Sequence, residues 1–327
     1  MIRLLITGGA GFIGSNFIRY MLDRYKANIH VTNIDLLSYA GNLSNLADIE
    51  GLSNYQFVQG DIADSELVRR LLQEPYDAII HFAAESHVDR SIEGPLGFFH
   101  TNVMGTLVLL EAARKRGIER FIHISTDEVY GSLGPQGSFT ELTALLPNSP
   151  YSASKASSDM AVRAYYHTYG FPSIITRCSN NYGPRQYPEK LIPRMITNAL
   201  QGIPIPVYGD GRQVRDWLHV NDHCQAIDLV LRSGRPGEVY NIGSNNELTN
   251  IEVIKRILKV LNKPDSLIQF TQDRLGHDRR YAINAEKIRN ELGWRSEVSF
   301  DRGLQSTIEW YTRNIDWWKP LVQSEAL

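Results

Sequence analysis

The amino terminus carries the pattern that most constrains the fold: an apolar strand, a glycine-rich turn and a helix, in that order. Ile2–Thr7 is nearly continuous in apolar residues, which is typical of a parallel strand buried on both faces. GGAGFIG follows, and Ser15–Tyr25 then has apolar residues at helical spacing. The glycines fit G-x-G-x-x-G from Gly9, and a variant with a longer first gap from Gly8. This order predicts a dinucleotide site, with Gly8, Gly11 and Gly14 at the pyrophosphate, over a coincidental glycine turn.

A carboxylate at the end of the next strand favours one cofactor. His30–Ile34 reads as a strand and ends at Asp35, about twenty residues after the last glycine. A carboxylate there can accept the adenosine ribose hydroxyls and would repel a 2′-phosphate. Leu36 and Leu37 offer no arginine for such a phosphate, so NAD is favoured over NADP.

Strand and helix patterns continue to alternate as far as residue 178. The expected strands are Ile2–Thr7, His30–Ile34, Tyr55–Gln59, Ala78–Phe82, Phe121–Ser125 and Ser173–Arg177. Ser65–Leu72, Thr101–Arg116 and the segment from Tyr151 to Gly170 read as helices. This alternation predicts an α/β fold, a Rossmann-like doubly wound parallel sheet in residues 1–178.

Small and acidic residues at two of these strand ends are further cofactor candidates. Asp61 is a possible adenine contact, although it could equally be the N-cap of the next helix. Ala83 and Ala84 are small enough for the cofactor to lie against the end of their strand.

The character of the chain changes after Cys178. Turn-forming and aromatic residues dominate SNNYGPRQYPEKLIPR, and IPIPVYGDGRQVRDWLHV mixes proline, glycine and charge. We expect residues 179–327 to form mainly a smaller substrate-binding lobe, with a segment near 216–243 returning to the first domain; solvated loops are the alternative. Polar side chains suited to a phosphorylated ligand are Asn180, Asn181, Lys190, Arg212, Arg215 and the loop Arg274–Arg280.

Composition excludes several function classes. A net charge of −2 gives no electrostatic basis for binding nucleic acid or an acidic membrane. No apolar run approaches the length needed to span a bilayer, and glycines interrupt the only segment that resembles a signal peptide. Two cysteines, Cys178 and Cys224, have no metal-ligand spacing, which indicates reduced thiols and no metal site. A cytoplasmic enzyme fits these features best.

Two segments carry the candidate catalytic groups. The strand within RFIHISTDEVYG should place Thr126, Asp127 and Glu128 at its carboxyl end, where open α/β sheets bind ligands. YSASK then places Tyr151 and Lys155 on one helical face, where the ammonium would lower the pKa of the phenol. Each pattern alone has a simpler explanation, because Tyr-x-x-x-Lys also arises by chance and an Asp-Glu pair can be a solvated turn. The nearby dinucleotide site favours catalysis.

These groups suit an oxidation coupled to an elimination. Tyr151, assisted by Thr126, would deprotonate an alcohol while the carbinol carbon gives hydride to NAD. The ketone acidifies the neighbouring C–H, so Glu128 could act as base and Asp127 as the acid that expels a β-hydroxyl, if their environments separate their pKa values. Return of the hydride would regenerate NAD.

A family resemblance extends over essentially the whole chain. The motifs that carry it are TGGAGFIG, GDI, HFAAESHVDRS, TN, STDEVYG, YSASK, RCSNNYGPRQYPEKLIP, VYGDGRQVRDWLHVNDH and DRLGHDRRYAIN. The chain resembles the dTDP-glucose 4,6-dehydratase family of the extended short-chain dehydrogenase/reductase superfamily. The glycine turn and YxxxK occur throughout that superfamily. The Asp127-Glu128 pair is the specific part, since the related sugar epimerases lack it.

The resemblance implies a lyase that converts dTDP-glucose to dTDP-4-keto-6-deoxyglucose with bound NAD. It implies Asp127 as acid for the C6 hydroxyl, Glu128 as base at C5, Tyr151 as base at the C4 hydroxyl, and Lys155 holding both Tyr151 and the ribose. It also implies a homodimer joined through helices near 101–116 and 151–169. The implied cofactor contacts are Phe12, Ile13, Asp35, Asp61, Ile62, Thr101 and Asn181. The implied substrate contacts are Ser86, Asn180, Lys190, Leu191, Pro206, Tyr208, Arg215, Asn250, Arg274 and His277.

Some alternatives stay open from the sequence. The nucleobase cannot be read from spacing, so a dehydratase, epimerase or decarboxylase acting on a UDP-, GDP- or CDP-sugar remains possible. A remote alternative is an NAD-binding regulator without turnover, which the intact catalytic set argues against. One departure from the family is the short connector at 132–150, which could open the site or change its partners.

Overall fold

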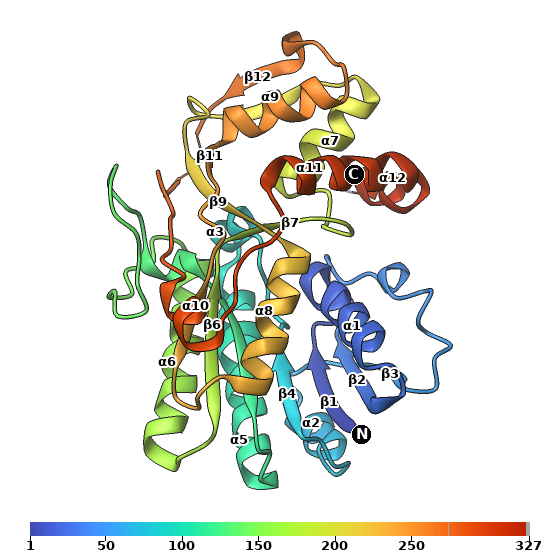
Figure 1. Cartoon of the computed structure of the whole chain (residues 1–327), viewed down its shortest axis with the longest axis vertical. Coiled ribbons are helices and arrows are strands. Elements are labelled where there is room, and N and C mark those ends of the chain that lie inside the picture. The colour runs from blue at the N-terminus through green and yellow to red at the C-terminus, as the bar shows by residue number, and fades with distance from the viewer. Residues whose placement is uncertain (274, 325–327) are drawn as a thin grey trace.

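A seven-stranded parallel sheet forms the base of the molecule. The computed structural model describes residues 1–273 and 275–324. The strand order is β10-β6-β5-β4-β1-β2-β3, and every adjacent pair is parallel. The strands run upward from the N-terminus toward the second lobe (Figure 1). Their bounds are β1 Ile2–Thr7, β2 Ile29–Asp35, β3 Tyr55–Gln59, β4 Ala78–His81, β5 Phe121–Thr126, β6 Ser173–Cys178 and β10 Val239–Ile242.

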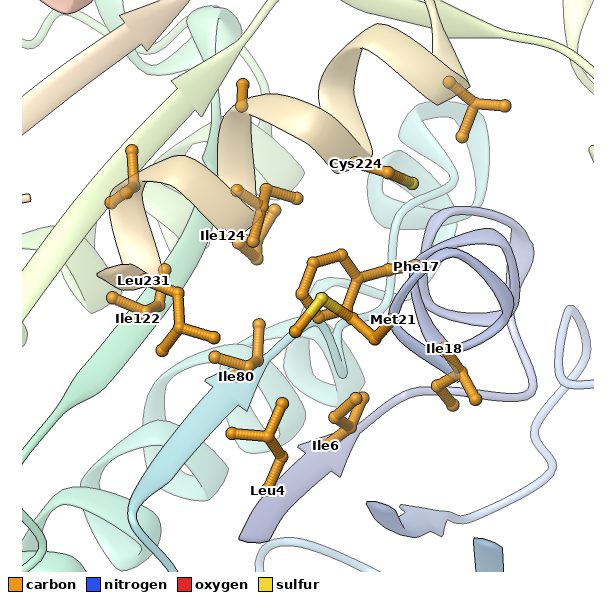
Figure 2. Close-up of a cluster of buried hydrophobic side chains, with 14 of the residues drawn as sticks. Leu4, Ile6, Phe17, Ile18, Met21, Ile80, Ile122, Ile124, Cys224 and Leu231 are labelled. Carbon is orange, nitrogen blue, oxygen red and sulfur yellow. The ribbon is translucent and has the colours of Figure 1, made fainter. Parts of the chain in front are cut away.

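Helices cover both faces of the sheet, because successive side chains of a strand point to opposite faces. Leu4 and Ile6 of β1 pack beneath α1 and α8 (Figure 2), in a core to which α10 adds Ile288. Leu5 packs on the other side of the sheet with α2, α5 and α6. The predicted doubly wound fold is therefore confirmed. The bounds of these helices are α1 Phe12–Tyr25, α8 Val220–Ser233, α10 Glu286–Leu292, α2 Ser65–Leu71, α5 Thr106–Arg116 and α6 Pro150–Tyr169.

The sheet is completed by a segment from late in the chain. β10 pairs with β6, and α8 packs on α1, where Cys224 and Leu231 contact the same core as Phe17 and Met21 (Figure 2). One face of the sheet is therefore covered partly by residues beyond 216.

The second lobe lies above the carboxyl ends of the strands (Figure 1). It has its own buried hydrophobic core, which includes Ile196, Trp217, Ile254 and Leu304. Its strands form a three-stranded sheet, β11-β9-β7, and a pair, β12-β8. The elements are β7 Asn180–Tyr182, β8 Ile205–Tyr208, β9 Val214–His219, β11 Glu247–Thr249, β12 Ile268–Thr271, α7 Leu191–Gln201, α9 Asn250–Val260, α11 Phe300–Arg313 and α12 Ile315–Ser324.

One long helix differs from the sequence prediction. The predicted helix Thr101–Arg116 is the last part of a continuous helical stretch that includes α4 Pro95–Phe99, a π-helical turn His100–Gly105 and α5. In the described residues, Pro95–Arg116 is 22 residues long and contains an 18-residue window with a mean hydropathy of 1.2, so it is long and apolar enough to cross a membrane. The expectation that no segment reaches such a length was therefore wrong. Gly97, His100 and Asn102 interrupt its apolar residues, so the sequence shows no continuous apolar run there.

Candidate active site

A pocket of about 300 Å³ lies at the carboxyl ends of the sheet strands, beneath the second lobe. It is lined by residues from the glycine turn, the ends of β2, β4 and β5, the start of α6 and the segment after β6. All fourteen predicted cofactor residues line it: Gly8, Gly11, Phe12, Ile13, Gly14, Asp35, Asp61, Ile62, Ala83, Ala84, Thr101, Tyr151, Lys155 and Asn181. All five predicted catalytic residues line it too: Thr126, Asp127, Glu128, Tyr151 and Lys155.

The glycine turn fits a dinucleotide pyrophosphate. Gly8 has φ +72°, and a Cβ there would lie 2.5 Å from the nitrogen of Ala83. A Cβ on Gly14 would lie 2.4 Å from the oxygen of Gly8, so neither position admits a side chain. The helix α1 begins at Phe12, three residues earlier than predicted, and no side chain caps it. Its first N–H groups are thus left for an anion at the positive end of the helix.

The turn is also held from the second lobe. The indole of Trp317 on α12 donates to Oδ1 of Asn45 at 3.0 Å, and Nδ2 of Asn45 donates to the carbonyl of Ala10 in the turn at 2.8 Å. The N–H of Ala10 in turn donates to Asp35 at 2.9 Å. A chain of hydrogen bonds therefore connects the C-terminal helix to the proposed cofactor site.

Two acidic side chains flank the predicted adenosine site. Asp35 is buried and accepts the N–H groups of Ala10 and Leu37 at 2.9 and 2.8 Å, and burial raises its pKa. Asp61 accepts the N–H of Ala63 at 2.8 Å. The N-cap of α2 is Asp64, not Asp61, so the structural alternative for Asp61 was wrong.

The catalytic candidates come from two elements that meet at the pocket. β5 ends at Thr126, whose hydroxyl accepts the N–H of Glu128 at 3.3 Å and so caps the turn that carries both carboxyls. Ser149 is the N-cap of α6 and Pro150 fills its first position, which sets Tyr151 and Lys155 in the first turns. The hydroxyl of Ser152 on α6 donates to Glu128 at 3.3 Å.

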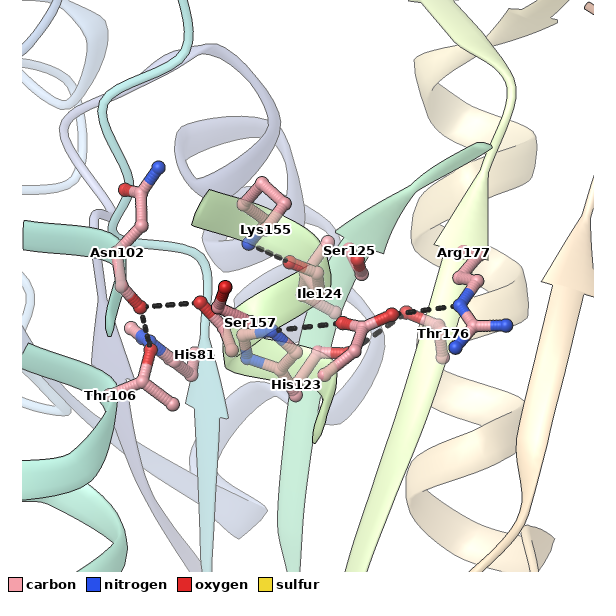
Figure 3. Close-up of polar contacts among 12 residues, drawn as sticks. His81, Asn102, Thr106, His123, Ile124, Ser125, Lys155, Ser157, Thr176 and Arg177 are labelled. Atoms are coloured by element: carbon pink, nitrogen blue, oxygen red, sulfur yellow. Dashed lines mark hydrogen bonds and ion pairs between the residues drawn. The ribbon is translucent and has the colours of Figure 1, made fainter. Parts of the chain in front are cut away.

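The electrostatics of Tyr151 differ from the prediction. Its pKa is raised well above the usual value, chiefly by burial and then by Glu128, while the hydroxyl of Thr126 acts in the opposite direction. Lys155 does not dominate this balance, because its ammonium is turned to the carbonyl of Ile124 at 2.8 Å (Figure 3). Burial itself lowers the pKa of Lys155, to about 8. The predicted lowering of the phenol pKa by Lys155 is thus not present in the chain alone.

The two adjacent carboxyls occupy different environments, as their proposed roles require. Asp127 is 1% exposed, and one of its oxygens, Oδ2, has no hydrogen-bond partner. Burial, followed by the charge of Glu128, raises the pKa of Asp127 well above the usual value. Glu128 is only partly buried. Asp127 is therefore the group that stays protonated and can donate a proton.

The predicted substrate residues divide into two groups. Ser86, Thr126, Asn180 and Lys190 line the pocket, and the ammonium of Lys190 donates to the carbonyl of Ser86 at 2.9 Å. The other described candidates lie in the second lobe outside the pocket lining, so their role stays a prediction: Leu191, Pro206, Tyr208, Arg215, Asn250 and His277. Arg274 lies outside the described residues.

Several pocket residues were not predicted. Tyr39, Glu85, Tyr187 and Glu189 form part of its wall, and Cys178 lies at the end of β6. The carboxyl-end rule for parallel sheets could have found Cys178, since it follows a predicted strand directly. No comparable signal marks Tyr39 or Glu189, because both lie in connecting segments.

Comparisons with known proteins agree on a family. The sequence model of the GDP-mannose 4,6 dehydratase family matches residues 5–307. A dTDP-glucose 4,6-dehydratase from Xanthomonas campestris pv. campestris (strain B100) is 56% identical over 336 residues, covering 97% of this chain and 95% of the relative. That of Escherichia coli is 49% identical over 351 residues, covering 98% and 96%.

Solved structures give the same result. The Streptomyces venezuelae dTDP-glucose 4,6-dehydratase with NAD and TYD bound has a TM-score of 0.95 and 52% identity, covering 98% of this chain and 100% of that one. A Thermotoga maritima UDP-glucose 4-epimerase with UDP-glucose is more distant, at a TM-score of 0.89, 30% identity and coverage of 96% and 100%. The agreement of sequence relatives and solved structures over nearly the whole length shows that this chain belongs to the dTDP-glucose 4,6-dehydratase family.

Proposed function

We propose that this chain converts dTDP-glucose to dTDP-4-keto-6-deoxyglucose and water, and recycles bound NAD in each turnover. The observation that carries the proposal is the pair of unlike carboxyls, Asp127 and Glu128, beside Tyr151 in one pocket. A simple dehydrogenase needs only the phenol and the cofactor, whereas loss of water needs an additional acid and base. The dTDP-glucose 4,6-dehydratases of similar sequence support this substrate.

Oxidation at C4 is assigned to the groups at the start of α6. Tyr151 removes the proton of the C4 hydroxyl, and Thr126 holds the oxygen through a hydrogen bond. NAD, when bound, would serve as the oxidant for C4 and, once reduced, as the reductant for C6, and its oxidised nicotinamide ring would carry a positive charge. The raised pKa of Tyr151 means that the chain alone does not activate the phenol, so activation depends on the assembled complex.

Elimination is assigned to the two carboxyls. Once C4 is a ketone, Glu128 takes the proton from C5 and Asp127 gives its proton to the C6 hydroxyl. The C6–O bond breaks, water leaves, and the electron pair of the C5–H bond forms a C5=C6 double bond conjugated with the ketone. The Glu128 carboxyl exchanges its proton with solvent and then protonates C5 when C6 is reduced. Asp127 suits the acid role because its pKa is raised.

The assembly is also part of the proposal. Helix Pro95–Arg116 and α6 carry exposed apolar side chains, which include Leu96 at 84%, Met104 at 51% and Met160 at 55% exposure. A second copy of the chain would cover these residues in a homodimer, and a membrane is not needed to explain them. Sedimentation at several protein concentrations tests this. We also place the enzyme in the cytoplasm, where its free thiols would stay reduced.

Incubation of the purified protein with dTDP-glucose in deuterium oxide tests the reaction. The expected product has lost one water, carries deuterium at C5 and shows the alkaline absorbance of a 4-keto sugar. Parallel incubations with UDP-, GDP- and CDP-glucose test the nucleobase. Turnover of another sugar nucleotide in place of dTDP-glucose would contradict the substrate, and NAD binding without any turnover would favour the non-catalytic alternative.

A further inference from the structure

Lys155 is a buried cation whose charge has no partner in the pocket wall that it touches. Its side chain is 4% exposed, and its ammonium donates to the carbonyl of Ile124 (Figure 3). A carbonyl accepts a hydrogen bond but carries no net charge, so this contact does not offset the cost of burying an ammonium. The opposing charge must come from another group.

Asp159 supplies a negative charge one helical turn further along α6. It is 1% exposed, and Oδ2 accepts a hydrogen bond from Nε of Arg177 at 2.8 Å. Oδ1 lies 3.4 Å from Nε2 of His123 and accepts no hydrogen bond. Residues four apart on a helix share a face, so Asp159 and Lys155 lie on the same side of α6.

The carboxylate is fixed from the sheet side. Arg177 on β6 also donates to the hydroxyl of Tyr130 at 2.9 Å, with its guanidinium 4.9 Å from the centre of that ring. Tyr130 donates in turn to Asn241 on β10 at 2.8 Å. The hydrogen bond to Tyr130 therefore fixes the position of Arg177. Rotation of the Asp159 side chain would break its hydrogen bond to Arg177.

The other titratable groups near Lys155 do not supply a negative charge. Burial lowers the pKa of His123 to about 4 and that of His81 well below its usual value, so both rings are neutral. Burial raises the pKa of Cys178 to about 12, which keeps it a thiol. The raised pKa values of Asp127 and Tyr151 keep those groups protonated. Asp159 is left as the ionised acid beneath Lys155.

We propose that Asp159 is a positioning residue for the reaction: its fixed negative charge, held by Arg177, keeps Lys155 protonated in the floor of the pocket. A protonated Lys155 can hold the ribose and favour the phenolate of Tyr151, whereas a neutral amine can do neither as well. This role rests on the proposed function, in which Tyr151 acts as base.

The charge of Asp159 should affect how activity depends on pH, because it affects the pKa of Lys155. Burial lowers the pKa of Lys155 to about 8, and the charge of Asp159 is the largest influence that raises it. Without that charge the pKa falls further, and Lys155 loses its proton near neutral pH. Activity should then fall at a lower pH than in the wild type.

Asp159→Asn tests the proposal through the pH profile of kcat/KM. We expect the alkaline limb to move down by at least one unit, with a deficit of tenfold or more at pH 8 that shrinks toward pH 6. Asp228→Asn is the matched control, because Asp228 is equally buried and paired with Arg24 at 3.2 Å and Arg232 at 3.2 Å, but lies on α8. The Asp228→Asn variant should be less stable than the wild type, but its pH profile of kcat/KM should be unchanged. A deficit in Asp159→Asn that is equal at every pH would overturn the proposal.

Thermal unfolding separates this proposal from the proposed function, because it needs no substrate. In Asp159→Asn, burying a protonated Lys155 costs more folding free energy than in the wild type. Above the wild-type pKa of Lys155, the amine is neutral in both folded proteins, so this difference disappears. The loss of stability should therefore be larger at pH 6 than at pH 9, opposite to the trend in activity. A stability deficit that does not change with pH would contradict the assigned charge, even if wild-type turnover of dTDP-glucose were absent.

Discussion

At the scale of single residues, the site depends on giving identical chemical groups different environments. Asp127 and Glu128 are adjacent in sequence and both line the pocket, yet Asp127 is buried and Glu128 is only partly buried. The sequence predicted both carboxyls and suggested a role for each, but it could not rank their pKa values, because burial depends on how β5 meets α6. For the same reason it gave Tyr151 a lowered pKa, where the folded chain raises it.

Replacing Asp127 should separate chemistry from stability. In Asp127→Asn we expect C4 oxidation to persist, seen as transient reduced cofactor, while elimination slows by about 10²-fold or more, as for loss of a general acid. Tyr151→Phe is the comparison and should abolish the oxidation itself. Equal, mild losses in both variants would contradict the assigned roles.

The same variant should be more stable than the wild type near neutral pH. The pKa of Asp127 is raised in the folded state, so its contribution to stability is present below the unfolded value of 3.8 and is lost as pH rises toward the folded value. The amide of Asn does not titrate, so the variant avoids this loss of folding free energy at neutral pH. Calorimetry should show a melting temperature higher by on the order of 2 °C at pH 7, where ~1 kcal/mol corresponds to such a shift, and a smaller difference near pH 4. A variant that is less stable at pH 7 would count against the buried, protonated acid.

At the scale of elements, the strands of the main sheet and the helix α9 could be predicted within about one residue, whereas the short strands of the second lobe could not. The parallel strands are continuous apolar runs, which identifies them locally. The strands β7, β11 and β12 have only three or four residues each. The helix α7 begins directly after a turn-rich stretch, so its start gave no signal. Side-chain chemistry pointed to Arg215 and the loop Arg274–Arg280, but the other substrate contacts predicted in this lobe rested on family resemblance alone: Leu191, Pro206, Tyr208 and Asn250.

The connection from α12 to the glycine turn predicts an effect on cofactor binding. Trp317→Phe keeps an aromatic ring but removes the hydrogen bond to Asn45, and a bond of this kind contributes about 1 kcal/mol. We expect NAD to bind about fivefold more weakly, measured by titration calorimetry. Trp310→Phe is the control, since Trp310 packs 4.9 Å from Trp317 between ring centres in the same cluster. Equal losses in both variants would assign the effect to packing.

At the scale of the whole molecule, the predicted boundary at residue 178 does not separate two independent cores. The face of the sheet formed by Leu4, Ile6 and Ile80 is covered by α1 together with α8, and α8 follows β9 in the chain. Val220–Ser233 lies within the segment near 216–243 that we expected to return to the first domain, and its buried residues belong to the core of the main sheet.

A fragment of residues 1–178 should therefore not fold stably. It contains the complete glycine turn, Asp127, Tyr151 and Lys155, yet it lacks α8 and β10 and leaves apolar surface open to water. We expect it to be insoluble, or to bind NAD without cooperative unfolding in circular dichroism. A soluble fragment with a sharp thermal transition would show that the sheet does not need its returning segment.

The late position of β10 also has a consequence for synthesis on the ribosome. The first six strands leave the exit tunnel before the helix and strand that complete their sheet have been made. Translation from residue 179 to the end of β10 at residue 242 takes roughly 3–13 s at about 5–20 residues per second. Throughout that interval the nascent chain exposes an apolar sheet face, which makes it a substrate for chaperones that bind emerging polypeptides.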